Sequence, residues 1–232
     1  MTFQIYYQDE NMVAIRKPPG YFVHRSTYDG SATEVVLQNL RDQLGQRVYP
    51  VHRLDRKTSG LLILALDKEV QTKLSYFFQE KMVQKLYLAL VRGNFQQEVL
   101  LDYPLLNEKG KIQQAATKFT PLITAELPFA SSSKYSTSRY SLVSAEPITG
   151  RQHQIRRHLA HLRYPIIGDR PYGCSKQNKY FLETWQTMRM YLHAFKLVLP
   201  HPISGEKIEI TVPPDEEFTS MLDVLHLNLS TF

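Results

Sequence analysis

The sequence predicts a protein of the α+β class, in which helices pack on a mixed, mainly antiparallel central β-sheet. Segments with the pattern of strands outnumber those with the pattern of helices. They also lack the regular strand–helix alternation of a doubly wound parallel sheet. Hydrophobic residues make up 43% of the chain and charged residues 22%, as in ordinary globular domains. With 232 residues, the chain forms one large domain or two small domains in close contact.

The expected strands are short apolar or alternating segments bounded by turn residues. Gly60–Leu66 is an apolar run that indicates a buried strand, although its length alone also fits a helix. In Gln84–Gly93, leucines alternate with tyrosine, alanine and valine, as in a strand buried on both faces. The full set is Phe3–Tyr7, Met12–Ile15, Tyr21–Val23, Gly60–Leu66, Gln84–Gly93, Val99–Leu106, Ala115–Leu122, Thr137–Glu146, Leu192–Leu199 and Lys207–Val212.

Four segments predict helices. Thr33–Leu44 has apolar residues at helical spacing, and Gly45 should end it. Asp67 is expected to cap the next helix. The other two predicted helices are Gln152–Leu162 and Asp215–Phe232. Between the predicted strands, the serine-rich segment Ala130–Ser136 predicts a flexible turn. The apolar stripe of the helix after Asp67 is expected to contain Val70, Leu74, Phe77, Phe78 and Met82.

The chain has a formal net charge of +6 and a pI of about 9.3, which is compatible with a polyanionic partner. Its single cysteine, Cys174, excludes an internal disulfide and suits a reducing compartment. No Cys/His cluster has zinc-like spacing, and no apolar stretch reaches membrane-spanning length. Asp9 and Glu10 precede any long apolar run, so no signal peptide is expected. Together these observations predict a cytoplasmic protein with no metal site and no membrane span.

One stretch, His52–Leu66, joins a cluster of charged side chains to an apolar run and reads HRLDRKTSGLLILAL. Asp55 lies where the charged loop enters the core, and the neighbouring Arg53 and Arg56 would keep its carboxylate ionised. A lone aspartate before a strand is usually a turn residue. An ionised, fixed carboxylate is also suited to act as a nucleophile. The residues alone leave both interpretations open.

The order of residues in this stretch resembles a known motif. HRLD-x-x-TSGLL is similar to the catalytic motif of the RluA family of pseudouridine synthases. Further segments in family order extend the resemblance over roughly residues 3 to 218. They are KPPG from Lys17, QKLYLALVRG from Gln84, TGRQHQIRRH from Thr149, YPIIGD from Tyr164, Tyr172-Gly173, and LHA from Leu192.

The resemblance implies roles for individual residues. It assigns catalysis to Asp55, Tyr87 and Arg156. In the family, the tyrosine lies against the catalytic aspartate and the arginine pairs with its carboxylate. His158 and His161, in the segment that contains Arg156, are expected on a solvated basic helix face. The residues implied in substrate binding are His52, Arg53, Lys17, Ile155 and His153.

The resemblance also implies a pseudouridine synthase fold with an RNA-binding cleft, formed by residues 1–232 as a single catalytic domain without a separate S4 domain. The implied reaction isomerises uridine to pseudouridine after the base is flipped out of its helix. It involves no redox change and no net hydrolysis, so no metal or organic cofactor is expected. Within the family, the chain most resembles the small members directed at uridine 65 of tRNA. We therefore expect a tRNA partner, and we expect the protein to be a monomer.

Alternative functions remain open at this point. Gln152 and Arg157 stand where more typical relatives have threonine and valine, and this departure favours tRNA over ribosomal RNA. A ribosomal RNA pseudouridine synthase of the same family is the first alternative, and a non-catalytic RNA-binding protein is the second. A glycosidase with an aspartate nucleophile is more distant, because such enzymes usually use paired carboxylates.

Overall fold

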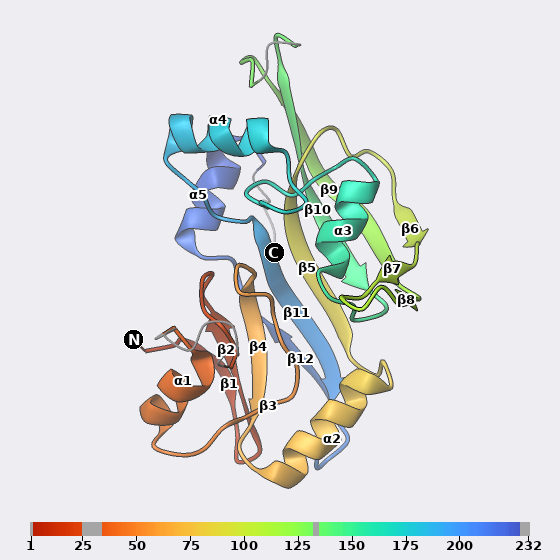
Figure 1. The fold of residues 1–232 in the computed structure, drawn as a ribbon. Helices are drawn as coiled ribbons and strands as arrows, with labels where there is room; N and C mark the ends of the chain where they lie inside the picture. The colour runs from red at the N-terminus through yellow and green to blue at the C-terminus, as the bar shows by residue number, and fades with distance from the viewer. Residues whose placement is uncertain (1, 25–33, 132–134, 228–232) are drawn as a thin grey trace. The chain divides into compact units, whose positions relative to one another are not determined.

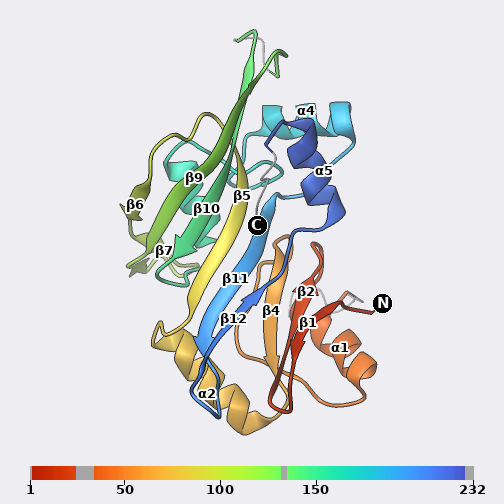
Figure 2. The same cartoon turned by 180° about the vertical axis from the view of Figure 1, so that it is seen from behind.

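The computed structural model describes residues 2–24, 34–131 and 135–227. The chain divides into two compact units, each built from discontinuous segments. Unit 1 comprises Met1–Lys85 and His193–Pro213, and unit 2 comprises Leu86–Leu192 and Pro214–Phe232. Figures 1 and 2 show the elements of both units from opposite sides.

Unit 1 contains strands in the order β1-β2-β4-β11, with β3 also paired to β4 and β12 to β11 (Figure 1). β4 and β11 run parallel, and His193 lies opposite Ser59. The other strand pairs of the unit are antiparallel. The strands are β1 (Ile5–Gln8), β2 (Met12–Lys17), β3 (Tyr49–Pro50), β4 (Ser59–Ala65), β11 (Leu192–Pro200) and β12 (Lys207–Thr211).

β4 is the buried centre of unit 1. All seven of its residues are buried, because it is paired on both sides. Gly60 has a φ of +109°, and a Cβ at this position would lie 2.2 Å from the carbonyl oxygen of Ala194. Only glycine allows this backbone conformation and this approach to β11. The Oγ of Ser59 lies 2.9 Å from Nδ1 of His193, which fixes the start of β4 a few residues after Asp55.

Two helices belong to unit 1. α1 (Val36–Leu44) ends at Gly45, whose φ of 67° gives the left-handed C-cap expected of a glycine. α2 (Lys68–Gln79) is capped by Asp67, whose side chain accepts hydrogen bonds from the backbone N–H groups of Glu69 and Val70. The expectation that Met82 belongs to the apolar stripe is wrong, because this residue lies beyond the end of α2 and is 45% exposed.

Unit 2 is built on four antiparallel strands in the order β5-β10-β9-β6 (Figure 2). A separate two-stranded hairpin joins β7 to β8. The strands are β5 (Gln84–Arg92), β6 (Val99–Asp102), β7 (Leu105–Leu106), β8 (Ile112–Gln113), β9 (Ala116–Leu127) and β10 (Ser138–Pro147). The helices are α3 (Gln154–His161), α4 (Ser175–Trp185) and α5 (Glu216–Val224).

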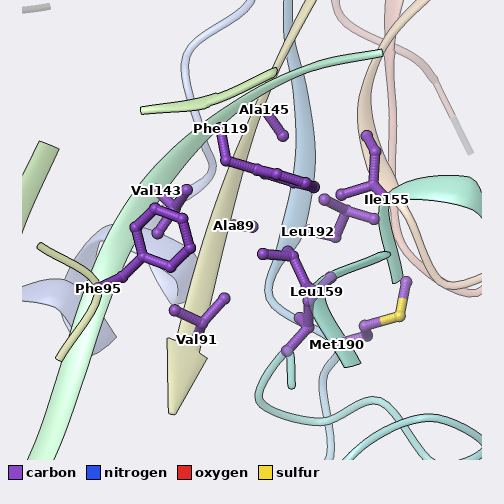
Figure 3. Close-up of a cluster of buried hydrophobic side chains, with 11 residues drawn as sticks. Ala89, Val91, Phe95, Phe119, Val143, Ala145, Ile155, Leu159, Met190 and Leu192 are labelled. Atoms are coloured by element: carbon purple, nitrogen blue, oxygen red, sulfur yellow. The ribbon is translucent and has the colours of Figure 1, made fainter. Parts of the chain in front are cut away.

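The core of unit 2 lies between α3 and the sheet. Figure 3 shows Ile155 and Leu159 of α3 on one side and Phe119 and Val143 of the strands on the other. Burial of these apolar side chains stabilises the packing of α3 on β9 and β10. The buried cluster contains Ala89, Val91, Phe95, Phe119, Val143, Ala145, Ile155, Leu159, Ile166, Met190 and Leu192.

The predicted fold class is confirmed, because the described strands pair mainly antiparallel, β4 and β11 pair parallel, and helices accompany the strands in both units. Several boundaries differ. Val99–Leu106 is two strands, β6 and β7, which pair with different partners. The helix expected from Thr33 begins at Val36, and Tyr21–Val23 contributes only a bridge between Phe22 and Val35. Part of the turn expected at Ala130–Ser136 lies outside the described residues.

Candidate active site

Asp55 begins a tight turn that leads into β4. Its carbonyl oxygen accepts a hydrogen bond from the backbone N–H of Thr58 at 3.1 Å, which closes a β-turn. Thr58 and all of β4 are buried, whereas Asp55 is only partly buried. A rigid turn therefore holds a carboxylate at the edge of the core. This position fits both interpretations of Asp55, a turn residue and a catalytic carboxylate.

Lys17 is bonded to this turn and is completely buried. Its ammonium group donates hydrogen bonds to the carbonyl oxygens of Pro18 at 2.9 Å, Tyr21 at 2.9 Å and Arg56 at 3.0 Å. Burial lowers the pKa of Lys17 to about 7; the negative charge of Asp55 raises the pKa, and the positive charge of Arg56 lowers it. Lys17 thus bonds the residue next to Asp55 and interacts electrostatically with Asp55 itself.

A second set of bonds ties the Lys17–Gly20 loop to the Asp55 turn. The backbone N–H of Gly20 donates to the carbonyl oxygen of Arg56 at 2.8 Å, and Nε of Arg56 donates to the carbonyl oxygen of Gly20 at 2.9 Å. The Arg56 guanidinium stands 4.7 Å from the ring centre of Phe22 and 4.0 Å from Glu34. Arg56 therefore links the two loops.

His52 is fixed by its surroundings in unit 1. Its Nε2 accepts a hydrogen bond from the backbone N–H of Ile63 at 3.0 Å, and its ring stacks on Phe78 with centres 4.4 Å apart. Burial, followed by the positive charge of Lys85, lowers the pKa of His52 to about 3. His52 is therefore neutral at neutral pH. Arg53, in contrast, is exposed and presents the motif's positive charge to solvent.

Tyr87 lies in β5, opposite Ala145 of β10. Its ring is partly buried and packs against the core cluster of unit 2. The strand that carries it continues into four consecutive buried residues, Leu88 to Val91. The sheet therefore fixes the backbone of Tyr87, and contact with the core restrains its ring. A restrained aromatic ring is suited to stack on a planar partner.

Arg156 is buried in α3 and forms a two-pronged ion pair with Asp169 of the same unit. Its Nε lies 2.7 Å from Oδ2 of Asp169, and its Nη2 lies 2.9 Å from Oδ1. The side chains are 8% and 1% exposed. The guanidinium also stands 5.1 Å from the ring centre of Tyr172. Arg156 is thus a fixed, buried cation rather than a mobile surface one.

The other two candidates of unit 2 precede Arg156 in the chain. His153 precedes α3 with a φ of 54°, in the left-handed region that residues other than glycine seldom occupy. Its Nδ1 lies 3.1 Å from the hydroxyl of Tyr172. Ile155 is 6% exposed and belongs to the core cluster. Its burial gives this residue a clear packing role beside Arg156.

His158 does not lie on a solvated face, and that expectation is wrong. Its ring is completely buried. Its Nδ1 lies 2.9 Å from Oγ1 of Thr117, and its Nε2 lies 3.0 Å from the carbonyl oxygen of Tyr103. These partners come from the sheet and a loop remote in sequence, so helical spacing could not reveal them. His161 is exposed, as expected, and stacks on Tyr103.

The sequence predicted no role for Asp169 or Tyr172, although both lie in segments that resemble family motifs. One signal was available. Arg156 neighbours the apolar face of α3 that carries Ile155 and Leu159, so its burial could have been anticipated. A buried arginine requires an acidic partner. Asp169 follows soon after in the chain and supplies that partner.

The candidate residues fall into two sets. Unit 1 holds Lys17, His52, Arg53 and Asp55, and unit 2 holds Tyr87, His153, Ile155 and Arg156. Within the described residues, no group of three or more His, Cys, Asp or Glu side chains is arranged to hold a metal ion. None of the helices in the described part of the chain has the length and hydrophobicity needed to cross a membrane.

Comparison with known proteins relates these residues to a family. The family model described as RNA pseudouridylate synthase matches residues 11–161. This range contains all eight candidate residues but neither Asp169 nor Tyr172. The tRNA pseudouridine synthase C of Pasteurella multocida (strain Pm70) is 43% identical over 242 residues, which cover 100% of this chain and 99% of that protein.

Other relatives agree with this result. The tRNA pseudouridine synthase C of Vibrio parahaemolyticus serotype O3:K6 (strain RIMD 2210633) is 43% identical over 95% of this chain and 94% of that protein. The solved structure of Human RNA Pseudouridylate Synthase Domain Containing 4 has a TM-score of 0.75 and 25% identity, covering 98% of this chain and 94% of that one. Human RNA Pseudouridylate Synthase Domain Containing 1 gives 0.73 and 25%, covering 92% and 84%. The chain therefore belongs to the RNA pseudouridylate synthase family.

Proposed function

We propose that this protein isomerises one uridine of tRNA to pseudouridine. The observation that carries the proposal is the similarity, at 43% identity over its full length, to a protein named tRNA pseudouridine synthase C. The basic excess of the chain suits a polyanionic substrate. In this reaction the bond between C1′ and N1 breaks, and a bond between C1′ and C5 forms. The proton on C5 leaves, and N1 gains one.

Three residues are proposed to carry the chemistry. Asp55 supplies a carboxylate that either adds to the base or assists at the sugar. Its position on a turn fixed by Lys17 supports this role, because a reactive group needs a defined geometry. Tyr87 is proposed to stack on the flipped uracil and to assist removal of the C5 proton. Arg156 is proposed to pair with the Asp55 carboxylate, as the family resemblance implies.

The remaining candidates are proposed to bind the RNA or to support the site. Arg53 is exposed and suited to a phosphate. His52 is neutral, so it would contribute shape and hydrogen bonding rather than charge. Lys17 is proposed to support the Asp55 carboxylate electrostatically from its buried position. His153 and Ile155 are proposed to support the position of Arg156. We also propose that residues 1–232 act as one catalytic domain, that the protein is a cytoplasmic monomer, and that the reaction needs no cofactor.

The substrate is tested by mapping pseudouridine in total RNA from a strain that lacks the gene. The proposal predicts loss of a single tRNA pseudouridine, at position 65, and its return when the wild-type gene is restored. Restoration with Asp55→Asn should fail. Loss of a ribosomal RNA pseudouridine with unchanged tRNA would favour the ribosomal alternative. An unchanged map in both RNAs would contradict catalysis by this protein in the cell.

A further inference from the structure

We propose that Asp169 is a positioning residue for the isomerisation, which holds the guanidinium of Arg156 in one orientation together with the ring of Tyr172. This inference rests on the proposed function, because it takes Arg156 to act in the reaction. It concerns a segment beyond the range matched by the family model, which ends at residue 161.

The first observation is the geometry of the ion pair. Two N–H groups on one edge of Arg156 donate to the two oxygens of Asp169, at 2.7 and 2.9 Å. A two-pronged pair fixes both the plane and the direction of a guanidinium, whereas a single bond leaves it free to turn. Both side chains are more than nine-tenths buried. Replacement of a buried ion pair by well-packed apolar residues is often neutral for stability, so we assign this pair the task of orienting the guanidinium.

The second observation is that Asp169 is itself held from several sides. Its Oδ1 accepts a further bond from the backbone N–H of Tyr172 at 3.3 Å. The side chain of Asn178 donates to its carbonyl oxygen at 2.8 Å and accepts from the N–H of Gly168 at 2.9 Å. Asp169 is therefore held by bonds that do not involve Arg156. Its carboxylate can thus determine the orientation of the Arg156 guanidinium.

The third observation is the crowding of the loop that carries Asp169. A Cβ at Gly168 would lie 1.7 Å from the carbonyl oxygen of Arg189, and one at Gly173 would lie 1.8 Å from that of Asp169. Such contacts cannot be relieved by moving a flexible side chain, because the opposing atoms belong to the backbone. The loop is therefore closely packed against other backbone at both glycines, in the conformation that places the Asp169 carboxylate on Arg156.

Tyr172 completes the arrangement. Its ring centre lies 5.1 Å from the guanidinium carbon of Arg156, within the range of a cation–π contact. Its hydroxyl lies 3.1 Å from Nδ1 of His153, which precedes α3 in a left-handed conformation. One tyrosine thus links the guanidinium to the start of the helix that carries it.

The test compares two arginine–aspartate pairs of unit 2, in each of which the arginine side chain is buried. Asp169→Asn removes one acceptor oxygen from the Arg156 pair and keeps the side chain's shape. Asp215→Asn does the same to the pair with Arg189, another buried arginine of the unit, and the asparagine retains a capping oxygen for α5. We expect Asp169→Asn to lower kcat for tRNA by about tenfold or more at nearly unchanged KM. Asp215→Asn should lower the melting temperature without lowering kcat.

A second variant covers the case in which Asp169→Asn does not fold. Tyr172→Leu removes the ring over Arg156 and leaves the ion pair in place. It should lower kcat at unchanged KM, whereas Tyr172→Phe, which keeps the ring, should retain most of the activity. Equal activity of the Leu and Phe variants would overturn the part assigned to the ring.

The outcomes separate this inference from the proposed function. An inactive wild-type enzyme, or full activity of Arg156→Lys, would overturn the proposed function of the site. A strong kcat defect in Arg156→Lys, together with unchanged kcat in both Asp169→Asn and Tyr172→Leu, would overturn the positioning role alone. In a double-mutant cycle, Asp169→Asn should add little to the defect of Arg156→Lys, because both changes disrupt one unit. Additive defects would contradict the inference.

Discussion

The Nζ of Lys17 lies 3.0 Å from the carbonyl oxygen of Arg56, so a buried ammonium group is bonded to the residue that follows Asp55. The same group bonds the carbonyl oxygens of Pro18 and Tyr21. Three acceptors on two chain segments thus share one donor group. This arrangement explains why a lysine, with three donors on a long stem, occupies a completely buried position.

The first prediction follows from the pKa of Lys17, which burial lowers from 10.5 to about 7. Between these pH values the unfolded chain keeps the proton and the folded chain loses it. The cost of burying the charge is therefore full below pH 7 and disappears as the pH rises toward 10.5. The free energy of unfolding of the wild type, relative to Lys17→Met, should rise through this window, with a slope approaching about 1.4 kcal/mol per pH unit. Urea titrations at several pH values measure the difference.

Lys73→Met, at an exposed position of α2, is the matched control for this measurement. Its difference from the wild type should not vary with pH in the same range. If the difference in unfolding free energy between the wild type and Lys17→Met is also independent of pH, Lys17 does not change its protonation between pH 7 and 10.5.

The second prediction concerns Gly60, where β4 approaches β11. Gly60→Ala would place a methyl group 2.2 Å from the carbonyl oxygen of Ala194 at a φ of +109°. The strands would have to separate, and we expect a loss of about 3 kcal/mol or more of unfolding free energy. Gly45→Ala is the control, because Gly45 also has a positive φ, of 67°, but meets no atom within 4 Å. It should cost about 1 kcal/mol. Equal losses in urea unfolding would show that the close approach of the strands is not important.

The third prediction concerns the binding of tRNA. The exposed basic side chains should release counterions from the phosphates. The logarithm of the binding constant should therefore fall linearly as the logarithm of the salt concentration rises. Arg53→Gln removes one exposed cation and should reduce the slope by about one. Filter binding at several salt concentrations gives both slopes. A flat plot for the wild type would show that the basic excess does not bind RNA.

The fourth prediction separates two roles of Tyr87. Tyr87→Phe keeps the ring that packs against the core of unit 2 but removes the hydroxyl group. If the hydroxyl assists proton removal, kcat should fall by about a hundredfold while tRNA affinity is unchanged. Tyr76→Phe, at a residue of α2 that is 56% exposed, serves as the control and should be fully active. Full activity of Tyr87→Phe would leave only the stacking role.

Much of the fold could be predicted because local rules decide it. Asp67 and Gly45 mark helix ends through their own side chain and backbone. The hairpin of β7 and β8 was missed, because strands of two residues show no periodicity. Its turn is organised instead by the side chain of Asn107, which accepts from the backbone N–H groups of Lys109 and Lys111.

The site was less predictable, because its contacts join distant segments. The bond from Lys17 to Arg56 spans 39 residues, so sequence could place the lysine near Asp55 only by resemblance. Burial of His158 depends on Thr117 and Tyr103. The helical pattern around His158 contains no information about those partners, which is why its surroundings were misjudged.

The most direct test of the central claim is tritium release from tRNA labelled with [5-³H]uridine, because the C5 proton leaves only when the base is rearranged. Wild-type protein and Asp42→Asn, a change at an exposed aspartate in α1, should release tritium at the same rate. Asp55→Asn keeps the shape of the side chain and should release none while binding tRNA with nearly unchanged affinity. Release by Asp55→Asn within about tenfold of the wild-type rate would contradict the assignment of Asp55 as the catalytic carboxylate.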